Sequence, residues 1–133
     1  GPVDLNFDHP QLAKILAGLR ETRTEQGPYG GPGWANYVAA YFNDCDRFCR
    51  VLKLTLARRG VGVVVIGNSI IQGHEVKTDL ILAHIARQHG FELLGVQKIR
   101  TKRVGASITT SAVRRGDQNQ ATLYESAIIV RKK

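Results

Sequence analysis

The chain has 133 residues, 43% of them hydrophobic, and its 19 Lys and Arg outnumber its 11 Asp and Glu, so that its formal net charge is +8. This length predicts one domain with its own core, and no apolar run reaches the roughly eighteen residues of a membrane span. The first residues lack signal-peptide features, so a cytoplasmic location without membrane association is expected. Gly1-Pro2 matches a tag-removal scar, which leaves 3–133 as the expected domain. The positive charge makes nucleic acid the first partner to test.

The N-terminal part of the sequence predicts two helices separated by a loop. Asp8 or His9 is expected to cap the first helix, with Pro10 in its first position. The segment GPYGGPG at 27–33 is too rich in Gly and Pro for a helix or a central strand and is therefore expected to be a loop. Apolar residues then recur every three or four positions, which predicts one long helix over 34–59 that ends at Gly60. The stripe consists of Trp34, Val38, Tyr41, Cys45, Phe48, Leu52 and Leu56.

Two cysteines, Cys45 and Cys49, stand four residues apart within the predicted long helix. On adjacent turns their thiols point the same way, which suits packing in a core and does not suit a disulfide between them. The alternative is half of a zinc site, but no second pair with ligand spacing follows. The spacing therefore favours core packing, and no metal site is predicted.

The C-terminal part of the sequence predicts three strands and a further helix. The stretch GVVVIGNSIIQG opens with valines, and an apolar run without alternation is typical of a strand buried on both faces. Thr78 is expected to cap the following helix, which Gly90 ends. The basic residues that follow the second strand are expected to begin a loop over 100–120. The expected strands are 61–66, 91–99 and 122–130, and the expected helix is 78–89.

This order of elements predicts an open α/β sheet. The first two strands are joined through a helix and should run parallel, whereas the third returns without a helix and should be antiparallel. Ligands of such sheets bind beyond the carboxyl ends of parallel strands, which is where Asn68 and Ser69 lie. These two residues are candidates to line a substrate or donor pocket by hydrogen bonding an amine, a ribose or a phosphate. The equal alternative is a turn in which Asn tolerates unusual backbone angles.

Basic side chains are concentrated after the second predicted strand, with six Lys and Arg and no acid from residue 98 to residue 115. Arginine offers a bidentate fork to phosphate oxygens, so this loop is expected to contact nucleic acid. The alternative is a solvated surface. Glu125, on the third strand, is expected to pair with a neighbouring Arg and not to act as a catalyst. The candidate contacts are Arg100, Lys102, Arg103, Arg114 and Arg115, the last two in a segment expected to order on binding.

Several short signatures resemble one family. A helix containing Tyr41-Phe42 and a strand ending in GNS are followed by TDLILAHIARQHGF, IRTKR and a final ESAIIVRK. From about Tyr41 onward, this succession resembles the C-terminal half of S-adenosylmethionine-dependent DNA methyltransferases that modify the exocyclic amine of adenine or cytosine. The resemblance implies a three-layer Rossmann-like methyltransferase sheet whose last strand is antiparallel beside the preceding one. It also implies S-adenosylmethionine as cofactor and DNA as partner, with RNA as the alternative substrate.

The family's donor-binding and catalytic motifs do not occur in this sequence. The first is a glycine-rich turn after the first strand, and the second is Asp, Asn or Ser followed by Pro-Pro and an aromatic residue. The resemblance therefore implies a C-terminal portion that contributes a pocket wall and a DNA-contacting loop, with no catalytic residue of its own. A missing N-terminal half or partner subunit is expected, and a sheet cut in this way should be open at one edge and form homo- or hetero-oligomers. The alternative function is nucleic-acid binding without chemistry.

Overall fold

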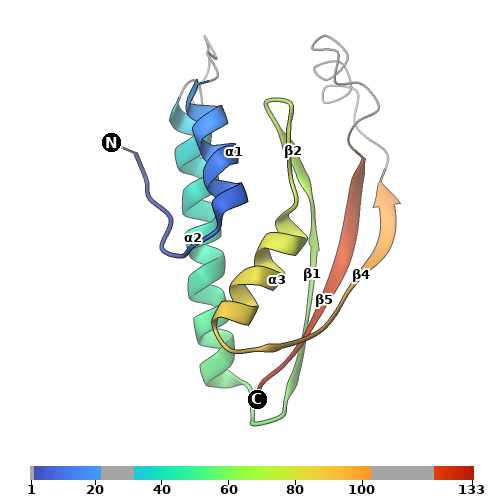
Figure 1. Cartoon of the computed structure of the whole chain (residues 1–133). Coiled ribbons are helices and arrows are strands. Elements are labelled where there is room, and N and C mark those ends of the chain that lie inside the picture. Colours follow the sequence, from blue (N-terminus) through green and yellow to red (C-terminus); the bar gives the residue numbers. More distant parts are fainter. Residues whose placement is uncertain (1, 22–31, 103–121) are drawn as a thin grey trace. The chain divides into compact units, whose positions relative to one another are not determined.

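The computed structural model describes residues 2–21, 32–102 and 122–133 (Figure 1). The chain forms two compact units, Gly1–Thr55 and Leu56–Lys133, which are described one at a time. The expectation of a single domain over 3–133 stays a prediction. Within the described ranges, no helix has the length and apolar character needed to cross a membrane.

The first unit is built on two helices, α1 (Pro10–Glu21) and α2 (Pro32–Thr55). The predicted start of α1 is confirmed, because Nδ1 of His9 accepts a hydrogen bond of 3.0 Å from the backbone N–H of Leu12. The predicted loop at 27–33 is wrong for its last two residues, which belong to α2, and 27–31 lie outside the described residues. Proline suits the first turn of a helix because its missing N–H has no partner there.

The buried face of α2 lies beside the predicted apolar stripe. Tyr41 and Phe48 of that stripe are 41% and 46% exposed, so the prediction is wrong for them. The buried face includes two alanines, which a pattern based on large apolar side chains does not register. The buried apolar residues of this unit are Leu12, Leu16, Leu19, Ala35, Val38, Ala39, Phe42 and Cys49.

The two cysteines of α2 are free thiols. Cys49 is buried, which confirms its predicted place in the core, and Cys45 is half-buried. Burial raises the pKa of Cys45 to about 11 and that of Cys49 to about 12. Both thiols are therefore protonated at neutral pH, whereas nucleophilic attack and metal binding need the thiolate.

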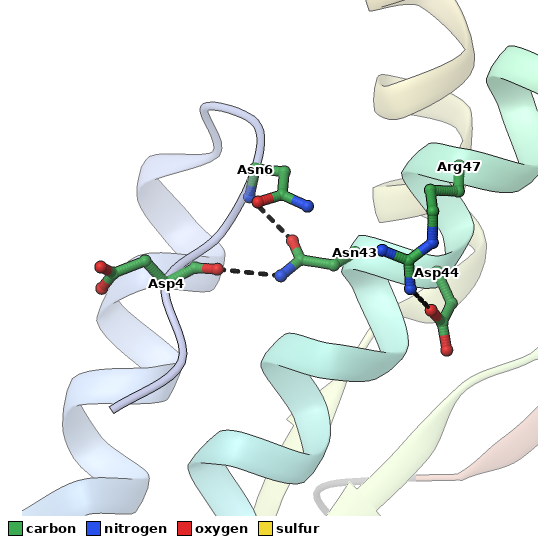
Figure 2. Close-up of polar contacts among 5 residues, drawn as sticks. All are labelled: Asp4, Asn6, Asn43, Asp44 and Arg47. Atoms are coloured by element: carbon green, nitrogen blue, oxygen red, sulfur yellow. Dashed lines mark hydrogen bonds and ion pairs between the residues drawn. The ribbon is translucent and has the colours of Figure 1, made fainter. Parts of the chain in front are cut away.

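An extended N-terminal segment is tied to α2 by asparagine side chains. Asn43, which is 7% exposed, accepts a bond of 2.7 Å from the N–H of Asn6 and donates one of 2.8 Å to the carbonyl of Asp4 (Figure 2). Two turns earlier on α2, Asn36 accepts a bond of 2.9 Å from the N–H of Val3. These amides satisfy backbone groups of a segment that belongs to no sheet.

The second unit contains a three-stranded sheet of β1 (Val61–Gly67), β4 (Glu92–Lys102) and β5 (Leu123–Arg131) in the order β1-β5-β4. The antiparallel last strand is confirmed, since β5 is antiparallel to both neighbours. It follows that β1 and β4 run in the same direction, as predicted, but β5 lies between them. The helix α3 (Thr78–Gln88) packs on this sheet (Figure 1). The unit is therefore α/β with a small antiparallel sheet.

The prediction that this strand is buried on both faces is wrong for β1 in the described structure. It lies at an edge of the sheet and pairs only with β5 there, and it is not buried on both faces. The exposed fractions of Val61, Val63 and Val65 are 49%, 60% and 56%. The apolar run has the composition of a strand covered on both sides, but α3 covers only one side of this sheet within the unit.

The chain also leaves α2 earlier than predicted, at Thr55 and not at Gly60. The N–H of Arg59 donates to the carbonyl of Lys132, and the N–H of Lys132 donates to the carbonyl of Gly60, both at 2.9 Å. Arg59 has a φ of 68°, in the left-handed region. Residues just before β1 thus pair with the C-terminal end of the chain and do not continue the helix.

A hairpin that the sequence did not predict follows β1. It consists of β2 (Ser69–Ile71) and β3 (His74–Val76), joined by Gln72-Gly73 with φ values of 51° and 80°. Two successive positive φ values are typical of the type I′ turn. The predicted Thr78 cap of α3 is wrong, because Lys77 is at the cap position and the Thr78 hydroxyl donates to the carbonyl of Val76 at 3.4 Å.

Candidate functional site

The end of β1 lies close against β5 at Gly67. A Cβ atom at this position would meet the carbonyl oxygen of Tyr124 at 2.8 Å, which real Cβ contacts do not tolerate. A larger residue would therefore push the two strands apart. Glycine at the predicted break of the strand is explained by this close approach of two backbones.

Asn68 continues the connection to β5 with its side chain. Its Nδ2 donates to Oε2 of Glu75 at 2.9 Å and to the carbonyl of Thr122 at 2.8 Å, and its Oδ1 accepts from the N–H of Tyr124 at 2.9 Å. With 8% of its surface exposed, the residue joins β1, the hairpin and β5. Both hydrogens of the amide nitrogen and one lone pair of its oxygen are thus engaged within the fold.

The two predicted pocket residues therefore differ. Asn68 is a clamp between strands. Its φ is not positive, and the non-glycine residues with positive φ in the described structure are Arg59 and Gln72. Ser69 is half-buried and opens β2, where its backbone pairs with Val76. The role of Ser69 in a pocket stays a prediction.

A polar cluster that the sequence did not predict lies beside this clamp. Asp79, in the first turn of α3, is 3% exposed. Its Oδ1 accepts a bond of 3.2 Å from the Tyr124 hydroxyl, and its Oδ2 accepts one of 2.8 Å from the Ser126 hydroxyl. The positive end of the helix dipole also favours a carboxylate here. We call Asp79, Tyr124 and Ser126 the Asp79 cluster; it fixes α3 to β5.

Tyr124 is held as a neutral hydrogen-bond donor. Burial, the charge of Asp79, the hydrogen bond to Asp79 and the charge of Glu75 together raise its pKa to about 12. Nζ of Lys98 lies 4.2 Å from the centroid of the Tyr124 ring, a favourable cation–π contact. At neutral pH the Tyr124 phenol therefore remains protonated.

Only some of the basic residues that were predicted in a loop belong to the described structure. Arg100 and Lys102 lie on β4, so the loop prediction is wrong for them, because β5 pairs with β4 as far as Lys102. Arg100 forms an ion pair with Glu125, which confirms the predicted role of that glutamate. The remaining candidates, Arg103, Arg114 and Arg115, lie outside the described residues.

The described part of the chain holds no group of three or more His, Cys, Asp and Glu that would suit a metal ion. The fold defines an α/β protein. In its sheet, β1 and β4 run in the same direction and the antiparallel last strand, β5, lies between them. Comparisons with protein-family models, with curated proteins and with solved structures find no match to the chain. Any functional conclusion therefore rests on the residues and their arrangement.

Proposed function

We propose that this chain supplies the C-terminal part of an S-adenosylmethionine-dependent DNA methyltransferase that acts on the exocyclic amine of adenine or cytosine. The observation that carries the proposal is the sheet, in which α3 joins two strands of the same direction and the last strand is antiparallel beside β4. The family resembled by the sequence ends its sheet in this way. The signatures IRTKR and ESAIIVRK fall mainly on β4 and β5.

Within this proposal, the carboxyl end of β1 forms one wall of the substrate pocket. Ser69 contributes a hydroxyl to that wall, and Asn68 holds the wall to β5 through its amide. The described residues do not make a site for S-adenosylmethionine, because the Asn68 amide and the Asp79 carboxylate are both engaged within the fold. We therefore assign the binding of the methyl donor, and catalysis, to an N-terminal half with which this chain completes a Rossmann-like sheet.

The proposed DNA contact is the end of β4 and the segment that follows it. In the ladder Arg100 pairs with Glu125 and Lys102 with Leu123, so both residues belong to the last part of β4. Arg103, Arg114 and Arg115 extend this basic set. The Arg100 side chain is 67% exposed and that of its partner Glu125 is 21% exposed. An ion pair with one exposed partner is weak enough for a phosphate to replace the carboxylate.

Combined alanine substitution of Arg100, Lys102 and Arg103 is expected to weaken DNA binding and to flatten its dependence on salt. Removal of one contact to a phosphate reduces the steepness of log affinity against log salt by roughly 0.9. The measurement is DNA retention over a salt series. The matched control replaces three exposed basic residues elsewhere, Arg50, Lys53 and Arg87, and should change affinity less. Equal affinities for the two variants would contradict the assignment.

The whole proposal is tested by methyl transfer. The probe is the N-terminal half of a DNA amino-methyltransferase from the same genome, chosen because it carries the glycine-rich donor turn and the Pro-Pro-aromatic motif. Neither polypeptide alone should transfer labelled methyl groups, and the mixture should label DNA. If the mixture labelled RNA but not DNA, the substrate would be RNA. Salt-sensitive DNA retention without transfer by the mixture would contradict the proposal and favour a binding module without chemistry.

A further inference from the structure

A tight turn with two central arginines precedes β1. The N–H of Gly60 donates to the carbonyl of Ala57 at 2.7 Å, so Arg58 and Arg59 are the middle residues of a four-residue turn. Arg59 has a φ of 68°. A positive φ at the third residue is typical of a type II turn, where glycine or asparagine is favoured. The backbone alone therefore does not explain an arginine at this position.

Hydrogen bonds to the C-terminal segment hold this turn in place. The N–H of Arg59 donates to the carbonyl of Lys132, and the N–H of Lys132 donates to the carbonyl of Gly60, both at 2.9 Å. Figure 1 shows the C-terminus beside this turn. Nζ of Lys132 donates to the carbonyl of Leu56, also at 2.9 Å. These bonds keep Arg59 in a conformation that its own side chain disfavours, on a backbone that is fixed before any ligand binds.

Positive charge is concentrated in the turn and in the C-terminal segment beside it. The basic residues here are Arg58, Arg59, Arg131, Lys132 and Lys133. Arg131 pairs with an acid, Glu92, at 3.7 Å. Among the described residues, no carboxylate forms an ion pair with Arg58 or Arg59, and both arginines are exposed. Their guanidinium groups are therefore available to an anion from outside the chain.

The turn lies at the opposite end of the sheet from the DNA contact proposed above. Leu123, which begins β5, pairs with Lys102, whereas Arg131, which ends β5, pairs with Val61 directly after the turn. An antiparallel strand rises about 3.4 Å per residue, so the length of β5 separates the two basic regions by roughly 27 Å. One phosphate group is too small to contact both regions.

We propose that Arg58 and Arg59 form a second phosphate-binding site, which contacts the backbone of a nucleic acid at the amino end of β1. We call these two residues, together with Lys132 and Lys133, the basic turn. Arginine presents a planar fork of N–H donors that fits two oxygens of one phosphate. Because the backbone of the turn is already fixed, little conformational freedom is lost when a phosphate binds.

A nucleic acid suits the basic turn better than an acidic protein segment does. Duplex DNA carries one negative charge per about 1.7 Å of its axis, so several neighbouring cations find phosphates together. Contacts to phosphate position a protein on DNA without reading its sequence. We therefore assign the basic turn to positioning of the nucleic acid. The inference does not rest on methyl transfer.

Arg59→Gly separates a binding role from a structural role. Glycine adopts a positive φ without steric cost, so this variant should unfold at the temperature of the parent chain or up to about 4 °C above it. Its affinity for DNA should nevertheless fall roughly five- to tenfold at about 0.1 M salt, because one phosphate contact is removed. Gln72→Gly is the matched control, since Gln72 is the other non-glycine residue with positive φ among those described. Its affinity should equal that of the parent chain.

A double variant tests the site against attraction by net charge. Arg58→Gln combined with Arg59→Gly should weaken binding to a duplex of about 20 base pairs at least about twentyfold at 0.1 M salt. The charge-matched control, Lys14→Gln with Lys77→Gln, removes two exposed charges elsewhere and should weaken binding less than about threefold. Fluorescence anisotropy over a salt series measures both affinities. Equal losses in the two double variants, or unchanged affinity in Arg59→Gly, would overturn the inference.

The remaining outcomes separate the basic turn from the contact at the end of β4. Distant contacts contribute independently, so the double variant should cause the same fold-change when Arg100, Lys102 and Arg103 are alanine, measured at a salt concentration where that variant still binds. Loss of the effect in that background would overturn the inference. Binding of poly-L-glutamate as tight as that of DNA, with the same dependence on Arg58 and Arg59, would overturn it in favour of an acidic protein partner. The chain is tested alone, so a failure of methyl transfer would contradict only the proposed function.

Discussion

Replacement of Asn68 with alanine is expected to lower the free energy of unfolding of the second unit by about 2–4 kcal/mol. The substitution removes the partner of the Tyr124 N–H, the partner of the Thr122 carbonyl and a donor to Glu75. A backbone group left unpaired in a buried setting costs about 1–3 kcal/mol, more than the net value of the bond itself. Denaturant unfolding followed by circular dichroism measures the difference.

Two further substitutions show whether the amide acts as a clamp. Ser69→Ala, the adjacent predicted pocket residue, is half-buried and is expected to change stability by less than about 0.5 kcal/mol. Asn68→Asp keeps an oxygen for the Tyr124 N–H but places a second carboxylate beside Glu75. Repulsion would raise the pKa of the new acid in the folded state, so the stability of Asn68→Asp should increase as pH falls. Equal stability of Asn68→Ala and Ser69→Ala would contradict the clamp.

The elements of the second unit were predictable because their signals are local. Gly60 and Gly90 mark boundaries between elements. Between these boundaries, an apolar run indicates a strand and a helical period indicates a helix. The order of the strands was not predictable from such signals, because β5 enters between β1 and β4 through pairs such as Val61 with Arg131. The hairpin was missed because its strands are short and Gln72 is an unusual residue at a left-handed turn position.

The polar end of β1 was predicted from the sequence, whereas the contacts of its residues were not. The break at Gly67-Asn68-Ser69 was visible, but two partners of the Asn68 amide, the Thr122 carbonyl and the Tyr124 N–H, lie far along the sequence. The third, Glu75, lies on a strand of the hairpin that was not predicted. Asp79 was missed because an acid in the first turn of a helix is ordinarily exposed and explained by the helix dipole. The signal in the sequence that could have predicted this cluster is the spacing of Tyr124 and Ser126, which lie two residues apart on the last strand. Two hydroxyls on one face of a strand, opposite a helix with an early acid, predict such a cluster.

Replacement of Asp79 with alanine is the second large effect that we expect, a loss of about 3 kcal/mol in the free energy of unfolding. It leaves the hydroxyls of Tyr124 and Ser126 without their acceptor, and Ser126 is only 1% exposed. Relief from burying a carboxylate offsets part of this cost. Asp79→Asn should cost less, about 1 kcal/mol, because one amide oxygen still accepts and a hydroxyl is able to turn and accept in return.

The pKa of Tyr124 distinguishes loss of this cluster from a general loosening of the unit. In Asp79→Ala the pKa should fall from about 12 toward 10, because the charge of Asp79 and its hydrogen bond are both removed. It should stay above 10, because burial is the largest cause of the rise. Titration of the Tyr124 ring by NMR measures this change. The raised value makes the folded unit lose stability as pH increases from about 10 to about 12, and that loss should be smaller in Asp79→Ala. An unchanged pKa would mean that the Tyr124 hydroxyl and the Asp79 carboxylate do not interact, and the Ser126 hydroxyl would then be the group of the Asp79 cluster that joins Asp79 to β5.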